Sequence, residues 1–111
     1  MEVVTTEKEG IIIIALTGRL DANSSSSVTD ELESLVSEGV KILFTLNAME
    51  YISSAGLRSL LVIAKKIRSN NGKMCLTGLT ENVREVFDVS GFSSILHLCA
   101  TEEEAIGVLT E

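Results

Sequence analysis

The chain has 111 residues, of which 45% are hydrophobic and 4% aromatic, so it can form one domain with an aliphatic core. Its formal net charge of −7 argues against a general nucleic-acid-binding protein, which needs a basic face for phosphates. The longest apolar run, residues 11–16, is too short to span a bilayer, and the first residues do not resemble a signal peptide. We therefore expect a soluble cytoplasmic domain that neither contacts nucleic acid directly nor enters a membrane.

The first half of the chain predicts two strands, a helix and a third strand. Residues 3–6 and 11–16 flank a polar turn at 7–10, which predicts an antiparallel pair that ends at 18–21. The serine run before position 28 predicts a capped helix start, and Gly39 marks its stop. The apolar face of this helix is expected to hold Val28, Leu32, Leu35 and Val36. Residues 41–46 predict an interior strand that leads into Ser53 and Ser54.

The second half alternates helices with strands. Helical spacing of apolar residues predicts a helix from Ser54 to about Ser69, closed by the Asn-Asn-Gly sequence at 70–72, and a strand follows at 73–78. A further helix is expected between Thr80 and Gly91, a short strand over 95–98, and a last helix behind the capping box at 101–104. This alternation predicts a single α/β domain over residues 1–111, with a mixed, mostly parallel sheet.

Two adjacent serines, Ser53 and Ser54, precede Gly56 at the expected start of the central helix. Hydroxyl groups at this place cap the free backbone N–H groups of a helix, which is their commonest use. The same place favours an added negative charge because the helix dipole points its positive end there. The serines are therefore either two caps or a cap and a phosphate acceptor.

The charges are distributed unevenly. Residues 51–80 contain five basic residues and no acidic one, whereas every carboxylate lies elsewhere in the chain. Lysines and arginines in the last turns of the central helix are explained by the helix dipole. Arg58 is not, because it lies in the first turn, where the dipole disfavours a cation. We expect Arg58 to contact an acidic partner surface.

No catalytic or metal-binding pattern is evident. Ser54, His97 and Asp21 would be the members of a hydrolase triad, but no Gly-x-Ser-x-Gly elbow surrounds Ser54, and His97 is expected to be structural. A P-loop is absent, and the acidic run at 102–104 is typical of a solvated helix start. Cys75 and Cys99 lie among apolar residues and are expected to be buried free thiols, not a zinc site. We expect neither an enzyme nor a bound cofactor or metal.

The order of several motifs resembles a known family. These motifs are Gly18-x-Leu20-Asp21, the apolar strand at 41–46, the run Tyr51-Ile52-Ser53-Ser54-Ala55-Gly56-Leu57, Gly72 and the closing Glu103-Glu104-Ala105. Together they resemble the STAS family of bacterial anti-sigma-factor antagonists over essentially the whole chain. The resemblance implies a phosphorylatable serine at Ser54. The partner-binding residues that it implies are Asp21, Ser53, Ser54, Gly56 and Arg58.

The resemblance also implies a mechanism. An anti-sigma factor with a histidine-kinase-like ATPase fold binds the unmodified protein and thereby releases a sigma factor, so transcription changes. The same partner phosphorylates the serine, which breaks the complex, and a serine phosphatase restores it. We expect the antagonist to be a monomer without a catalytic activity of its own.

The chain departs from the family pattern at two positions. Ser53 stands where the family usually has an aspartate, and Thr45 stands where an aspartate or asparagine is common. These departures leave a second hypothesis open, in which the domain is a non-phosphorylated interaction module of a larger signalling assembly and both serines are caps.

Overall fold

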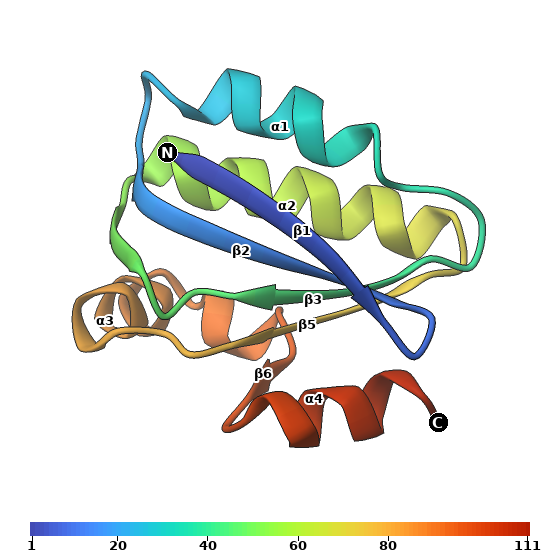
Figure 1. Ribbon diagram of the computed structural model, residues 1–111. Coiled ribbons are helices and arrows are strands. Elements are labelled where there is room, and N and C mark those ends of the chain that lie inside the picture. The colour runs from blue at the N-terminus through green and yellow to red at the C-terminus, as the bar shows by residue number, and fades with distance from the viewer.

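The computed structural model describes all of residues 1–111 (Figure 1). The strands are β1 (Glu2–Lys8), β2 (Ile11–Leu20), β3 (Lys41–Thr45), β4 (Met49–Ile52), β5 (Lys73–Thr77) and β6 (Leu98–Cys99). The helices are α1 (Ser25–Glu33), α2 (Ser54–Ser69), α3 (Glu81–Ser90) and α4 (Glu102–Leu109), with a 3₁₀ turn, η1 (Phe92–Ser94), after α3. None of these helices is long and apolar enough to cross a membrane.

The sheet has the strand order β1-β2-β3-β5-β6, and β4 pairs with the far end of β2. Only β1 and β2 are antiparallel; every other pairing is parallel. Helices therefore cross over between the parallel strands, as the alternation in the sequence predicted. The predicted α/β class and mixed, mostly parallel sheet are confirmed.

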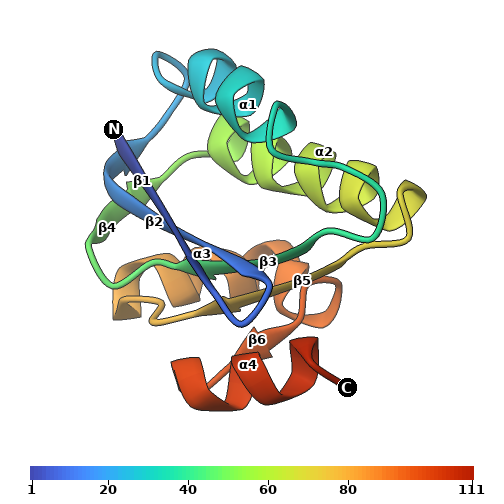
Figure 2. The same ribbon diagram turned by 45° about the vertical axis from the view of Figure 1, so that its right-hand side comes forward.

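The two faces of the sheet carry different layers. Helices α1 and α2 lie side by side over one face, and α4 covers the opposite face near the C-terminus (Figures 1 and 2). The larger core is aliphatic, apart from Phe44 and Phe87, and it packs β2–β5 against α1, α2 and α3. A smaller core lies under α4 and includes both cysteines together with Ile11, Leu43, Ala105 and Leu109.

The hairpin between β1 and β2 is tighter than predicted. Both strands extend to a two-residue connection, Glu9-Gly10, whose φ angles of 55° and 77° are both positive. This is the backbone that a two-residue hairpin with right-handed twist requires, and glycine and polar residues adopt it most easily. The antiparallel pairing itself is confirmed.

Two further element boundaries differ from the prediction, and one strand is additional. Helix α1 ends at Glu33, so Leu35 and Val36 follow it as a turn and pack on the core from there. The predicted strand at 95–98 is instead the two-residue β6, because the Leu96 N–H donates to Phe92 O and keeps the chain in the η1 turn. Strand β4 was not predicted.

Strand β4 escaped prediction because its burial does not alternate. Met49 and Ile52 are buried, while Glu50 and Tyr51 between them are exposed. A half-buried strand is recognised by strict alternation, which is missing here. Because of β4, Ser53 and Ser54 lie beside the end of β2, whereas the sequence had predicted that they follow β3 directly.

Candidate functional site

The start of α2 is fixed to the end of β2 by backbone hydrogen bonds. Ser53 N–H donates to Leu20 O at 2.9 Å, and Gly18 N–H donates to Ala48 O at 2.9 Å. Gly18 has a φ of +102°, and the β2–β4 register shifts between it and Arg19. A glycine is favoured at such a bulge because other residues are strained at this φ. Two chain segments that are distant in sequence, residues 18–21 and 48–56, thus meet at one end of the sheet.

The two serines have different roles at this helix start. Ser53 is the N-cap, and its Oγ accepts a hydrogen bond from Gly56 N–H at 3.2 Å. Ser54 is the first residue of α2, is exposed, and its hydroxyl makes no hydrogen bond within the chain. The hypothesis of two caps therefore accounts for Ser53 only. The Ser54 hydroxyl is free and faces solvent.

Gly56 is required by close packing. A Cβ atom at this position would lie 2.6 Å from Leu20 O and 2.9 Å from both Leu20 Cγ and Ile52 Cγ1. Real side chains do not approach a carbonyl oxygen so closely, so the first turn of α2 rests directly on the ends of β2 and β4. This glycine sets the position of the Ser54 hydroxyl relative to the sheet.

Asp21 organises the loop that follows β2. Its carboxylate accepts hydrogen bonds from Asn23 N–H at 3.0 Å and from Ser24 N–H at 3.2 Å, and Ser24 Oγ accepts from Asp21 N–H. Partial desolvation raises the pKa of Asp21, but these donors and the charge of Arg19 outweigh it and hold the pKa below its ordinary value. Asp21 is half-buried and directly follows Leu20, whose carbonyl oxygen accepts the hydrogen bond from Ser53 N–H. By fixing its own loop, Asp21 therefore helps to position the backbone that contacts the serines.

Arg58 lies one turn beyond Ser54 on the exposed face of α2. It takes part in neither of the two salt bridges of the chain, which join Lys66 to Glu33 and Arg84 to Asp88. It lines a shallow groove between α1 and α2 whose other walls include Ser26, Asp30 and Val62. Ser54, Arg58 and Val62 follow at i, i+4 and i+8 and are all exposed, so they form a continuous stripe, here called the α2 stripe.

A second shallow groove lies on the other side of Ser54. It separates the start of α2 from α3 and is lined by Ser54, Leu57, Asn82, Glu85, Val86, Val89 and Ser90. Val89 is 83% exposed, the largest exposure of any large hydrophobic residue in the chain. The residues of α3 carry no motif, so the sequence did not predict this groove. The one signal in the sequence was Val89, an apolar residue on the polar side of the helix.

Tyr51 also presents apolar surface near the serines. It is 40% exposed, and the guanidinium group of Arg19 lies 4.3 Å from the centre of its ring. This distance is typical of a cation–π contact, which holds the ring in place at the end of β4. The surroundings of Ser54 thus combine apolar patches with a free cation, as the central part of a protein interface does.

The structure excludes the hydrolase triad. The carboxylate of Asp21 is used by its own loop, and the Ser54 hydroxyl has no hydrogen bond to His97 or to any other base. A nucleophilic serine needs such a base within hydrogen-bond distance. His97 lies instead at the edge strand beside the two cysteines, and its side chain is exposed.

Comparison with known proteins agrees with this geometry. The family model described as STAS domain matches residues 2–105, which is nearly the whole chain. The chain belongs to the STAS domain family. The protein assigned as anti-sigma factor antagonist BtrV of Bordetella bronchiseptica is 35% identical over 106 residues, which cover 95% of this chain and 91% of that protein. The family resemblance predicted from the motifs is therefore confirmed.

Two further proteins are similar to the chain, one in sequence and one in structure. The anti-sigma-B factor antagonist of Bacillus subtilis is 24% identical over 100 residues, covering 90% of this chain and 92% of that protein. A crystal structure of a Thermotoga maritima protein assigned as anti-sigma factor antagonist superimposes with a TM-score of 0.89. That match covers 98% of this chain and 95% of the other at 19% identity, so it shows a shared fold.

Proposed function

We propose that this STAS domain is an anti-sigma-factor antagonist whose binding is controlled by phosphorylation of Ser54. In the unmodified state it binds an anti-sigma factor and so frees a sigma factor; phosphorylation ends that binding. The names of the Bordetella and Bacillus relatives support the class of partner. The observation that carries the switch is the free, exposed hydroxyl of Ser54 at the first position of α2, beside a cap that Ser53 already supplies.

The proposed switch works because the phosphate on Ser54 has different surroundings in the free domain and in the complex. A phosphate adds about −1.5 to −2 charge at pH 7. At the start of α2 the backbone N–H groups and the helix dipole favour that charge, and no acidic residue lies in the first turn to oppose it. Within an interface the same charge must lose its water, which costs several kcal/mol when nothing pairs it. Phosphorylation therefore removes binding and leaves the fold intact.

The proposed binding surface is centred on Ser54. The α2 stripe supplies Arg58 for an acidic patch and Val62 for apolar contact, and Val89 of α3 extends the apolar surface on the other side. Gly56 and Ser53 hold the stripe in position, and Asp21 holds the neighbouring loop. Each of these residues thus has a binding or a positioning role.

The proposed partners follow from the family resemblance. The anti-sigma factor is a serine kinase with a histidine-kinase-like ATPase fold, and a separate serine phosphatase restores the unmodified protein. The domain itself is a cytoplasmic monomer that is not an enzyme and that needs no cofactor. The Ser54 hydroxyl has no hydrogen bond to a base, which supports a passive phosphate acceptor, since the kinase then brings the catalytic groups.

One observation favours a second candidate function. The family's usual aspartate before the phosphorylated serine is Ser53 here, and Thr45 replaces another acidic or amide residue. A less acidic loop suits a module that binds its partner without being phosphorylated. In that case Ser54 would be a surface residue of a permanent complex.

The decisive experiment incubates the native chain with its cognate anti-sigma kinase and ATP. Mass spectrometry should place one phosphate on Ser54, and the phosphorylated protein should no longer bind the kinase. Ser54→Ala should keep binding, resist modification and keep its melting temperature, because the native hydroxyl makes no hydrogen bond.

Ser53→Ala is the matched control for that experiment. It should still be modified at Ser54, and it should lose about 1 kcal/mol of stability with its cap. A phosphate found on Ser53 alone would overturn the assignment of the site. If the native chain binds its partner but stays unmodified after incubation with the kinase and ATP, the second candidate is favoured.

A further inference from the structure

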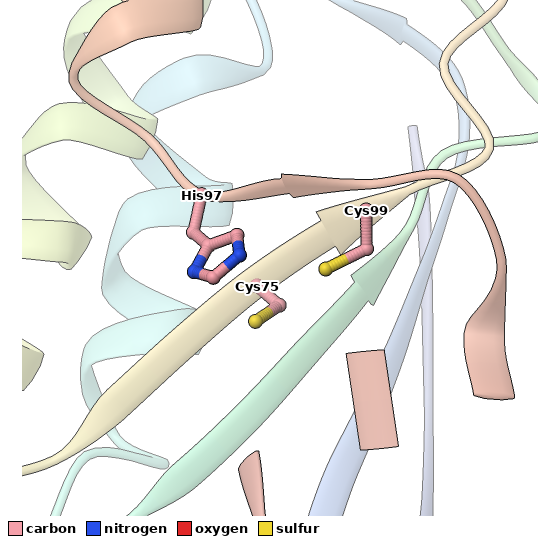
Figure 3. Close-up of side chains that lie close together, drawn as sticks. All are labelled: Cys75, His97 and Cys99. Atoms are coloured by element: carbon pink, nitrogen blue, oxygen red, sulfur yellow. The ribbon is translucent and has the colours of Figure 1, made fainter. Parts of the chain in front are cut away.

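All of the cysteine and histidine side chains of the chain meet at one place. The chain has two cysteines and one histidine, and their ligand atoms, Cys75 Sγ, Cys99 Sγ and a ring nitrogen of His97, lie within 4.8 Å of one another (Figure 3). Cys75 belongs to β5, Cys99 to β6, and His97 immediately precedes β6. Figure 3 shows the three side chains directed toward a common space beside the edge of the sheet. These are the thiol and imidazole groups that bind zinc in proteins.

The backbone holds these groups in place without any ion. Strands β5 and β6 are paired in parallel register, Leu76 with Leu98 and Thr77 with Cys99, and Leu76 N–H donates to His97 O at 2.9 Å. Because side chains alternate along a strand, His97 and Cys99 emerge on one side, while Leu98 between them faces the other. That side is the one covered by α4, where Cys75 is buried as well.

The spacing of the ligand atoms is close to what an ion requires. With Zn–S bonds of about 2.3 Å and Zn–N bonds of about 2.0–2.1 Å, tetrahedral ligand atoms lie about 3.3–3.8 Å apart. The observed upper limit of 4.8 Å is wider than this, so binding requires the side chains to rotate toward the ion. The thiols are buried, whereas His97 is exposed at the edge strand, so the imidazole is the ligand that an ion from solvent meets first.

The two sulfur atoms lie in the buried surroundings of the smaller core. Both thiols are free, so neither sulfur is used in a disulfide. A divalent cation bound to the two thiolates would remove the cost of their negative charges in this buried place.

We propose that Cys75, His97 and Cys99 form a zinc site that joins the edge strand β6 to β5. On binding, each thiol releases its proton to the solvent, so that two thiolates and one neutral imidazole coordinate Zn²⁺, and water occupies the fourth position. This departs from the expectation that the cysteines form no zinc site. The site lies under α4, on the opposite face of the sheet from α1 and α2, so it is independent of the phosphorylation of Ser54.

The test uses the full, reduced chain without oxygen. Titration with Co²⁺, a spectroscopic substitute for zinc, should give the visible bands of a tetrahedral site and a near-ultraviolet thiolate charge-transfer band, both saturating at one equivalent. Zn²⁺ should displace the Co²⁺ and raise the melting temperature in proportion to the logarithm of its free concentration. A titration without the thiolate band would overturn the proposal.

Variants then identify the ligands. His97→Gln removes one ligand at an exposed position where the fold is not at risk, and it should weaken zinc binding at least tenfold. Cys99→Ala should also reduce the thiolate band by about half, and its circular dichroism shows whether it remains folded. Glu103→Gln is the matched control, because it removes an exposed carboxylate of α4 outside the cluster and should leave zinc binding unchanged. Zinc affinity unaffected by His97→Gln would show that the ion lies elsewhere.

Discussion

At the scale of single residues, the two neighbouring serines of the site have separate roles. Ser53 satisfies a backbone N–H of α2 and leaves the adjacent Ser54 hydroxyl free. If one serine had both roles, modification would remove a cap and weaken the helix that presents the phosphate. Separate residues allow the charge at Ser54 to change while the start of the helix keeps its hydrogen bond.

Asp21 should make stability depend on pH on the acid side. Folding lowers its pKa below the ordinary value of 3.8, so its contribution to the free energy of unfolding is complete above that value and is lost as the pH falls through the lower folded value. Asp21→Asn removes the charge. The difference in unfolding free energy between the native chain and this variant should therefore shrink as the pH falls from about 5 to about 2, measured by urea unfolding. A difference independent of pH would show that the charge of Asp21 is not involved.

Arg58 should affect partner binding but not folding. It is exposed and has no ionic partner within the chain, so Arg58→Glu should leave the melting temperature nearly unchanged. Binding to the anti-sigma factor should weaken at least about tenfold, a loss of about 1.4 kcal/mol. Arg68→Glu makes the same change of charge near the other end of α2 and should leave binding intact. Equal affinity of the Arg58 variant and the native chain would remove Arg58 from the interface.

At the scale of elements, the position of α2 depends on one glycine. Gly56→Ala introduces a Cβ atom 2.6 Å from Leu20 O, so α2 or the end of β2 must move. We expect a loss of about 1–3 kcal/mol in the free energy of unfolding, although alanine is the better helix former. Because the displaced turn carries Ser54, phosphorylation should slow as well.

Gly107→Ala is the matched control for this change. Gly107 lies within α4, and a Cβ atom there meets nothing within 4 Å. Relief from the conformational cost of glycine should then raise stability by up to about 1 kcal/mol. If thermal unfolding shows a loss of stability for Gly56→Ala and a gain for Gly107→Ala, the lack of space for a Cβ atom, and not helix propensity, explains the glycine at position 56. A gain in stability for both would contradict the close packing.

The elements that the sequence predicted well are those with local signals. The caps Thr80 and Thr101 accept hydrogen bonds from Val83 N–H and Glu104 N–H, as the turn residues indicated, and Gly91 ends α3 with a φ of 81°. Strands β4 and β6 were missed or misplaced because only their pairing with β2 and β5 defines them. Likewise, a motif indicated Ser54 and Gly56, whereas the groove beside α3 and the Cys–His cluster arise from contacts that no short sequence segment contains.

At the scale of the whole molecule, the two faces of the sheet have different roles in these proposals. The face under α1 and α2 holds the larger core, and Ser54, the proposed phosphorylation site, lies at the start of α2. The face under α4 holds the smaller core and the cluster of Cys75, His97 and Cys99. Because Ser54 is exposed, a charge added there changes the surface and leaves the core as it is, which suits control by exclusion from an interface.

The variant Ser54→Asp distinguishes exclusion from a change of fold. Its carboxylate lies in the first turn of α2 and four residues before Arg58, and both positions favour it by a few tenths of a kcal/mol. The melting temperature should therefore stay the same or rise slightly. Binding to the anti-sigma factor should nevertheless weaken at least about a hundredfold, about 2.7 kcal/mol, because the charge is desolvated in the complex. Thermal unfolding and calorimetric titration of the same preparation measure both quantities. A parallel loss of stability and binding would mean that the negative charge acts by disrupting the domain, and exclusion from the interface would then not be the mechanism.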